Sequence, residues 1–105
     1  MDITFANSKL KKLCEDHKRL KKSYGQLQAE RIIKRINEFQ SSENLFDISK
    51  LPQARLHQLT GNLKGLWAVD ILQPYRILIK LLNGSPEDLK TITEIEITEI
   101  GKDYH

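Results

Sequence analysis

The hydrophobic pattern of the chain changes near its middle, and this change constrains the fold more than any other feature. Before residue 41, apolar residues recur three and four positions apart, which is the spacing of one buried helix face. After residue 52, apolar and polar residues alternate in short runs separated by glycine, asparagine and proline, as in strands joined by turns. The sequence therefore predicts helices first and an antiparallel β-meander after them.

The first half predicts a short strand and then a helical hairpin. The strand is expected at residues 2–5, and Asn7 or Ser8 can cap the first helix. A break at residues 24–25 separates that helix from a second one at residues 26–40. The apolar stripes of the two helices are Leu10, Leu13, Cys14 and Leu20, and then Leu27, Ile32, Ile33, Ile36 and Phe39.

The second half predicts a small sheet. Residues 45–52 are expected to form a crossing loop whose apolar side chains pack inward, namely Leu45, Phe46, Ile48 and Leu51. Strands are expected at residues 54–59, 66–71, 75–82 and 91–100. The predicted fold class is α+β, with the N-terminal strand and helical hairpin packed on one face of a small antiparallel sheet. With 105 residues, the chain is expected to be a single domain, 1–105.

Several protein classes do not fit this sequence. The longest apolar runs are too short to span a bilayer, and the first residues lack the basic and apolar regions of a signal peptide. The one cysteine, Cys14, cannot form an intramolecular disulfide, and no Cys/His spacing resembles a zinc site. We therefore expect a cytoplasmic protein with no membrane partner, in which Cys14 is a small buried hydrophobe.

Positive charge is concentrated before the last predicted strand. Residues 1–53 carry eleven Lys and Arg against seven Asp and Glu, and residues 54–86 carry four against one. Residues 87–105 reverse this balance, with two against six. A basic surplus of this kind suits an anionic partner such as nucleic acid, although a solvated helix face would give the same pattern.

The sheet face that the helices leave uncovered is predicted to carry cations and an imidazole. Alternation in the strand at residues 75–82 places Arg76 and Lys80 opposite the aliphatic side chains that face the helices. Arg55 and His57 are two positions apart in a neighbouring strand, so they are expected to share a face.

This residue set matches the needs of RNA cleavage without a metal. Such cleavage requires a base for the ribose 2′-hydroxyl, cations for the charged transition state and an acid for the leaving 5′-oxygen. His57 and His105 are the candidate acid and base. Arg55, Lys64 and Arg76 can hold phosphate oxygens. Because the sequence has no carboxylate cluster of the two-metal type, we expect no metal and no cofactor.

The chain ends in an acid, a phenol and an imidazole: Asp103, Tyr104 and His105. A terminal segment of this kind is either a frayed end or a docked part of a site. If it is docked, His105 transfers a proton and Asp103 orients a neighbouring histidine. Tyr104 then stacks on a base or assists proton transfer, and its alternative is an apolar plug against the sheet.

Four short motifs, in this order, resemble the HigB-type toxins of the RelE/ParE superfamily of bacterial type II toxin–antitoxin systems. They are RLHQLTG at residues 55–61, KGLWAV at 64–69, PYRI at 74–77 and the terminal DYH. The resemblance implies a RelE-like fold and a ribosome-dependent mRNA endonuclease (an mRNA interferase) that cuts message in the decoding site. It also implies a cognate antitoxin, commonly a helix-turn-helix DNA-binding protein, through which the toxin would reach operator DNA.

The resemblance also implies roles for single residues. The family's functional positions match His57, Lys64, Arg76, Asp103, Tyr104 and His105. Together with the residues of the uncovered sheet face, this gives a predicted catalytic set of His57, Arg76, Asp103, Tyr104 and His105 and a predicted RNA- or phosphate-binding set of Arg55, Lys64 and Lys80. The lysine-rich helical segment can add contacts to ribosomal RNA, and Trp67 is interpreted as a core residue rather than a base-stacking one. Two alternatives remain open: a ParE-like, non-enzymatic toxin that binds DNA gyrase, and a degenerate toxin that only binds its antitoxin.

Overall fold

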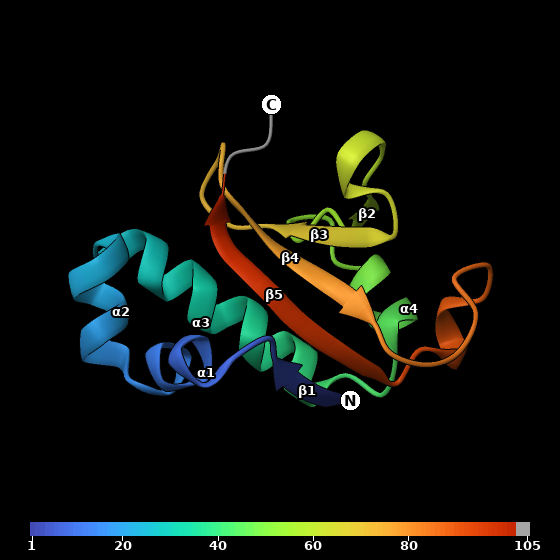
Figure 1. Ribbon diagram of the computed structural model, residues 1–105, viewed down its shortest axis with the longest axis horizontal. Coiled ribbons are helices and arrows are strands. Elements are labelled where there is room, and N and C mark those ends of the chain that lie inside the picture. Colours follow the sequence, from blue (N-terminus) through green and yellow to red (C-terminus); the bar gives the residue numbers. More distant parts are fainter. Residues whose placement is uncertain (103–105) are drawn as a thin grey trace.

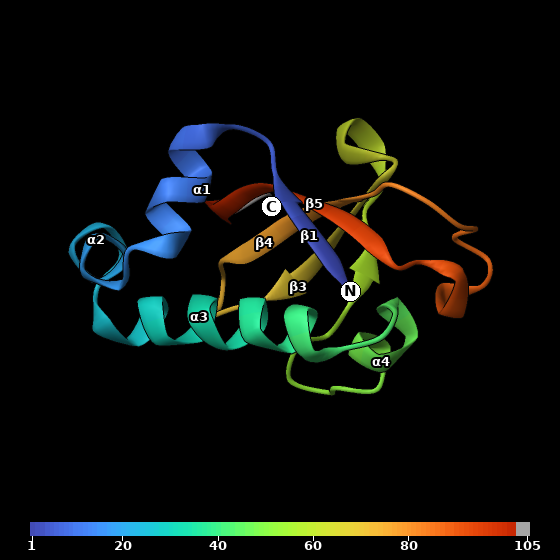
Figure 2. The same ribbon diagram turned by 90° about the horizontal axis from the view of Figure 1, so that it is seen from below.

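The computed structural model describes residues 1–102, so Asp103, Tyr104 and His105 lie outside the described residues. A sheet with the strand order β1-β5-β4-β3-β2 forms the centre of the molecule (Figure 1). Its strands are β1 (Asp2–Phe5), β2 (His57–Gln58), β3 (Leu66–Asp70), β4 (Arg76–Leu81) and β5 (Glu94–Lys102). The helices are α1 (Ser8–Glu15), α2 (His17–Tyr24), α3 (Gln26–Ser41) and α4 (Leu45–Ser49), with 3₁₀ turns at Gly61–Leu63 and Leu89–Thr91. Seen from below, α3 runs along one face of the sheet (Figure 2).

The helices begin where short polar side chains cap them. Asn7 accepts a hydrogen bond from the backbone N–H of Leu10 at 2.8 Å, which confirms the predicted start of α1. The first arm of the predicted hairpin is, however, two helices. Asp16 caps α2 by accepting from the Arg19 N–H at 3.2 Å, and its extended backbone ends α1.

The predicted crossing loop at residues 45–52 is wrong in part, because it contains α4. Asn44 caps this helix by accepting from the Asp47 N–H at 3.2 Å. Leu45 and Ile48 are buried, as expected, while Phe46 is half-buried. The ammonium groups of Lys50 and Lys90 each lie 5.0 Å from the centre of the Phe46 ring.

The sheet departs from the prediction at its two edges. The meander from β2 to β5 is antiparallel, but β1 pairs with β5 in parallel, so the sheet is mixed. The predicted strand at residues 54–59 is reduced to His57–Gln58. Its first half cannot continue the strand because Arg55 has a φ of 44°, far from extended backbone.

One main apolar core lies between the sheet and the helices. All four helices contribute to it, and β4 and β5 supply Ile77, Ile79, Ile95 and Ile97, as alternation predicted. Cys14 is buried in this core, where burial above all raises the pKa of its thiol to about 11. Trp67 is half-buried and packs against the same core. The prediction for Leu27 is wrong: it is 67% exposed because it lies on the outer face of α3 with Arg31 and Lys34.

The opposite face of the sheet carries a smaller apolar cluster of Leu59, Ala68 and Leu78, with Leu63 and Leu66 packed against it. The polar residues of that face lie beside this apolar cluster. Within residues 1–102, no helix is both long and apolar enough to cross a membrane.

Candidate functional site

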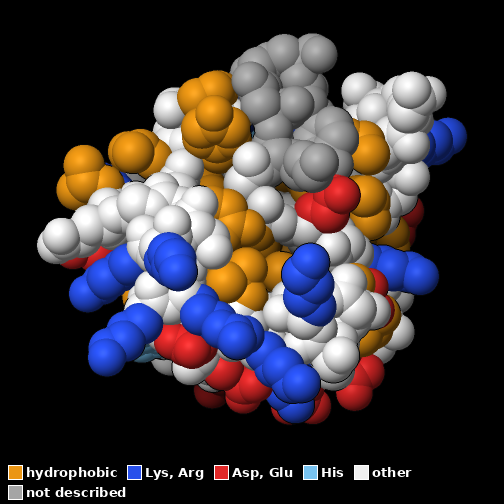
Figure 3. Space-filling view, turned by 60° about the vertical axis from the view of Figure 1, so that its left-hand side comes forward, with side chains coloured by type: hydrophobic (Ala, Val, Ile, Leu, Met, Phe, Trp, Pro, Cys, Tyr) orange, Lys and Arg blue, Asp and Glu red, His pale blue; other side chains and the backbone are white. Residues whose placement is uncertain are grey.

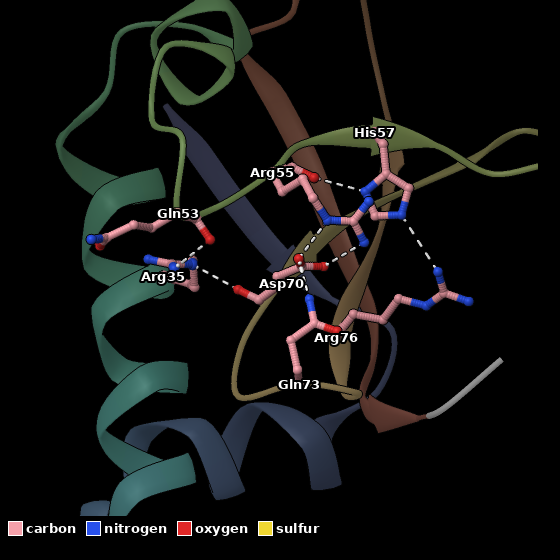
Figure 4. A network of polar contacts seen from close by, with 7 residues as sticks. All are labelled: Arg35, Gln53, Arg55, His57, Asp70, Gln73 and Arg76. Carbon is pink, nitrogen blue, oxygen red and sulfur yellow. Dashed lines mark hydrogen bonds and ion pairs between the residues drawn. The ribbon is translucent and has the colours of Figure 1, made fainter. Parts of the chain in front are cut away.

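His57 and Arg76 meet on the sheet face away from the helices. His57 is paired with Ala68 across β2 and β3, and Arg76 opens β4 opposite Asp70. Arg76 Nη1 lies 3.4 Å from His57 Nε2 (Figure 4). The predicted proximity of the imidazole and a guanidinium is therefore present.

The two neighbours of the His57 ring favour one of its two neutral tautomers. Nδ1 lies 2.7 Å from the carbonyl oxygen of Arg55, which can only accept, so Nδ1 carries a hydrogen. The Arg76 guanidinium can only donate, so Nε2 presents its lone pair. Of the two neutral tautomers, this arrangement fits the one with the hydrogen on Nδ1, and Nε2 then directs its lone pair at the Arg76 guanidinium.

The Arg55 side chain turns toward a buried carboxylate instead of standing free beside His57. Arg55 Nε donates to Asp70 Oδ2 at 2.6 Å and Nη2 donates to Oδ1 at 3.1 Å (Figure 4). This side-chain hydrogen bond raises the pKa of the Arg55 guanidinium. The Arg55 side chain is still 57% exposed, so part of it faces solvent. Its role in phosphate binding stays a prediction.

The Asp70 carboxylate accepts most of the hydrogen bonds around Arg55, and its role was not predicted from the sequence. Its side chain is only 8% exposed and also accepts a hydrogen bond from Gln73 Nε2 at 2.7 Å. A signal for it exists, because Asp70 is the single acidic residue between positions 54 and 86 and ends an apolar strand. A single carboxylate at the end of an apolar strand needs a cationic partner when it is buried.

Arg35 is a second functional candidate that the sequence reading missed. It is 2% exposed and reaches from α3 to the loop before His57 and to the end of β3. Its Nε donates to Asp70 O at 2.7 Å and its Nη2 to Gln53 O at 3.0 Å, while Nη1 pairs with Glu38 at 2.8 Å. The sequence feature that could have indicated its burial is its position between Ile32 and Ile36, which belong to the apolar stripe of α3.

Lys64 and Lys80, the other predicted phosphate ligands, lie farther from the histidine. Lys64 follows the 3₁₀ turn at Gly61–Leu63 and is exposed. Lys80 is exposed on the same side of β4 as Arg76, four residues on and therefore about 13 Å along the strand. In the part of the chain that the structure describes, no hydrogen bond joins either lysine to His57.

The basic side chains of the helical end are exposed, as a nucleic-acid partner or plain solvation would require. Figure 3 shows Lys and Arg side chains gathered on the face that this end of the molecule presents. The exposed Lys and Arg residues of α1 and α2 are Lys9, Lys11, Lys12, Lys18, Arg19, Lys21 and Lys22.

The described chain ends close to this site. In the register of β4 and β5, Lys102 pairs with Arg76. Asp103, Tyr104 and His105 follow directly but lie outside the described residues, so their roles stay predictions. Among residues 1–102, no three His, Cys, Asp or Glu side chains come together in a group that could hold a metal ion.

Comparisons with known proteins concern the family and the fold of the chain. A family model described as the RelE-like toxin of the type II toxin–antitoxin system HigB matches residues 3–91. A solved YoeB/ParE toxin from Agrobacterium tumefaciens has a similar fold, with a TM-score of 0.56 and 16% sequence identity. The similarity covers 99% of this chain and 100% of that one. No curated protein sequence matches the chain. Because the family model spans most of the sequence, the chain belongs to the HigB-like family of RelE-like toxins of type II toxin–antitoxin systems.

Proposed function

We propose that this toxin is a ribosome-dependent mRNA endonuclease that uses acid–base chemistry and no metal. The observation that carries the proposal is the pair of His57 Nε2 and Arg76 Nη1, 3.4 Å apart on the exposed side of the sheet. A neutral imidazole nitrogen next to a guanidinium combines a proton acceptor with a cation that can bind the reacting phosphate.

The reaction needs one proton removed and one proton supplied. His57 Nε2 takes the proton of a ribose 2′-hydroxyl, and the 2′-oxygen attacks the adjacent phosphorus. Arg76 stabilises the extra negative charge on the phosphate oxygens. The bond from phosphorus to the 5′-oxygen then breaks, and His105 supplies the proton to that oxygen. The products are a 2′,3′-cyclic phosphate and a 5′-hydroxyl end.

The remaining residues have supporting roles in this proposal. Tyr104 stacks on the substrate or assists proton transfer, and Asp103 orients a histidine. Arg55, Lys64 and Lys80 bind flanking phosphates, and the basic face of α1 and α2 contacts ribosomal RNA. The site of action is the cytoplasm.

Membership of the family makes the chain the toxin of a toxin–antitoxin pair, which implies an antitoxin partner. We propose that this antitoxin is a helix-turn-helix DNA-binding protein. Contact with operator DNA is then indirect, through the antitoxin.

Cleavage of a defined message on translating ribosomes tests the proposal. The purified toxin is expected to cut the message within codons and leave 5′-hydroxyl ends, while the same RNA without ribosomes stays intact. His57→Gln is expected to slow cleavage on the order of 100-fold or more, because it removes the base. Glu30→Gln, on the exposed side of α3, serves as a control and should cut normally.

Two results would count against this function. Cleavage by His57→Gln at the normal rate would show that the site lies elsewhere. Growth arrest with intact message and an induced DNA-damage response would favour the gyrase-binding alternative.

A further inference from the structure

We infer that Asp70 is a positioning residue that holds His57 in its Nδ1–H tautomer, acting through Arg55. The inference rests on the proposed function, because it explains how the Nε2 lone pair is kept directed at Arg76. Asp70 does not touch the imidazole itself. Its effect passes through the guanidinium of Arg55 and then through the carbonyl group of the same residue (Figure 4).

The first step is the anchoring of Asp70 by groups other than Arg55. Its backbone oxygen accepts from Arg35 Nε at 2.7 Å, and its backbone N–H donates to Ala54 O, also at 2.7 Å. Gln73 Nε2 holds one carboxylate oxygen at 2.7 Å. The carboxylate is therefore fixed by groups other than Arg55, and it can serve as a reference point for that residue.

The second step is the backbone of Arg55. Its φ of 44° lies in the left-handed region, which residues other than glycine adopt only when their surroundings hold them there. The two hydrogen bonds from its guanidinium to Asp70 restrain the side chain of Arg55 and so help to keep its backbone in this conformation. The hydrogen bond from Asp70 N–H to Ala54 O restrains the backbone of the preceding residue in the same way.

The third step is the direction of the Arg55 carbonyl. In this conformation its oxygen lies 2.7 Å from His57 Nδ1 and selects the tautomer with the proton on that nitrogen. If the carbonyl turned away, the other tautomer would become available, with a proton on Nε2. That proton would face the Arg76 guanidinium donor at 3.4 Å, and Nε2 would have no lone pair for a substrate hydroxyl.

Nitrogen NMR of the histidine rings tests the inference without any activity assay. The chain has three histidines, so the signals of His57 are identified by their loss in His57→Gln. At about pH 9, more than two units above the ordinary histidine pKa, a neutral ring reports its tautomer through the ¹⁵N shifts of its two nitrogens. The normal toxin is expected to show Nδ1–H for His57. Asp70→Asn should shift the ring to a mixture, because its amide nitrogen would face donors of Arg55 or Gln73.

A second variant keeps the inference testable if Asp70→Asn does not fold. Arg55→Gly removes the guanidinium but allows the same positive φ and keeps the carbonyl, so the fold should be retained. It should also shift His57 to a mixture of tautomers, while Glu30→Gln should leave the Nδ1–H form intact. An unchanged Nδ1–H tautomer in both site variants would overturn the inference.

Cleavage kinetics separate this inference from the proposed function. Asp70→Asn should lower kcat on ribosomes on the order of 100-fold, as for a misplaced catalytic group, with KM little changed. A loss of fold alone would lower the active fraction without moving the tautomer of the folded molecules. If the normal toxin cuts no message but its His57 tautomer still depends on Asp70, the proposed function fails and the positioning role stands.

Discussion

Arg35 is a buried side chain that donates hydrogen bonds to two backbone oxygens beside the site. Replacing it with Met keeps the apolar stem but leaves Asp70 O and Gln53 O without their donor. We expect Arg35→Met to lower the free energy of unfolding by about 2–4 kcal/mol, because buried acceptors lose their partner. Urea denaturation followed by circular dichroism measures this loss. Arg31→Met, on the exposed face of the same helix, should stay within about 0.5 kcal/mol of the original chain. Equal losses in the two variants would contradict the role of Arg35.

Single residues differ in how far the sequence could predict them. The side of the sheet on which Arg76 stands follows from alternation with Ile77, a purely local rule. The contacts of Arg35 and Asp70 join positions 35 residues apart and cannot be inferred from local spacing. The positive φ of Arg55 was equally hidden, because arginine has no special preference for it.

At the scale of elements, β5 carries a bulge where it runs beside the site. Ile77 pairs with Ile100 and Arg76 with Lys102, so Gly101 is the extra residue, with a φ of 80°. Tyr24, at the end of α2, packs on this glycine and donates to Ile100 O at 3.3 Å. The contact therefore joins α2 to the end of β5, where Lys102 pairs with Arg76.

Gly101→Ala is expected to destabilise the fold by about 2–4 kcal/mol. Its Cβ would lie 2.7 Å from the Tyr24 ring, and the positive φ adds strain. Gly61→Ala is the matched control, since it has a φ of 65° but nothing within 4 Å of the new Cβ, and should cost about 1 kcal/mol. Thermal unfolding of the two variants isolates the contact with Tyr24. Equal melting temperatures would mean that this contact contributes nothing.

Element boundaries were predictable where a local signal marked them and not elsewhere. The Asn7 cap and the break at Gly25 were read correctly from their residue types. Asp16 and Asn44 also act as caps, but Asp16 lies between Glu15 and His17, and Asn44 ends the polar run at residues 40–44, so each position is equally compatible with a turn or a loop. The parallel pairing of β1 with β5 joins residues at opposite ends of the chain, so no local pattern encodes it.

At the scale of the whole molecule, exposed positive charge gathers at the helical end. Helices α1 and α2, which carry the exposed lysines, lie at one end of the molecule, and the segment between β4 and β5 lies at the other (Figure 1). If the basic helical end binds ribosomal RNA, each phosphate contact releases counterions and makes binding salt-dependent. The position of the charges would then matter, and not only the net charge of +3.

Two triple variants with the same net charge separate position from total charge. Lys18→Gln, Lys21→Gln and Lys22→Gln together remove the three lysine charges of α2, and their counterpart combines Lys34→Gln, Lys50→Gln and Lys90→Gln. Binding to ribosomes at several salt concentrations should show a log–log slope that is smaller by about 2 for the α2 variant. The counterpart should keep the original slope, because its lysines lie near Gln53 or stack on Phe46. An equal change in both variants would assign the salt dependence to net charge alone and remove the basic face of α1 and α2 from the ribosome contact.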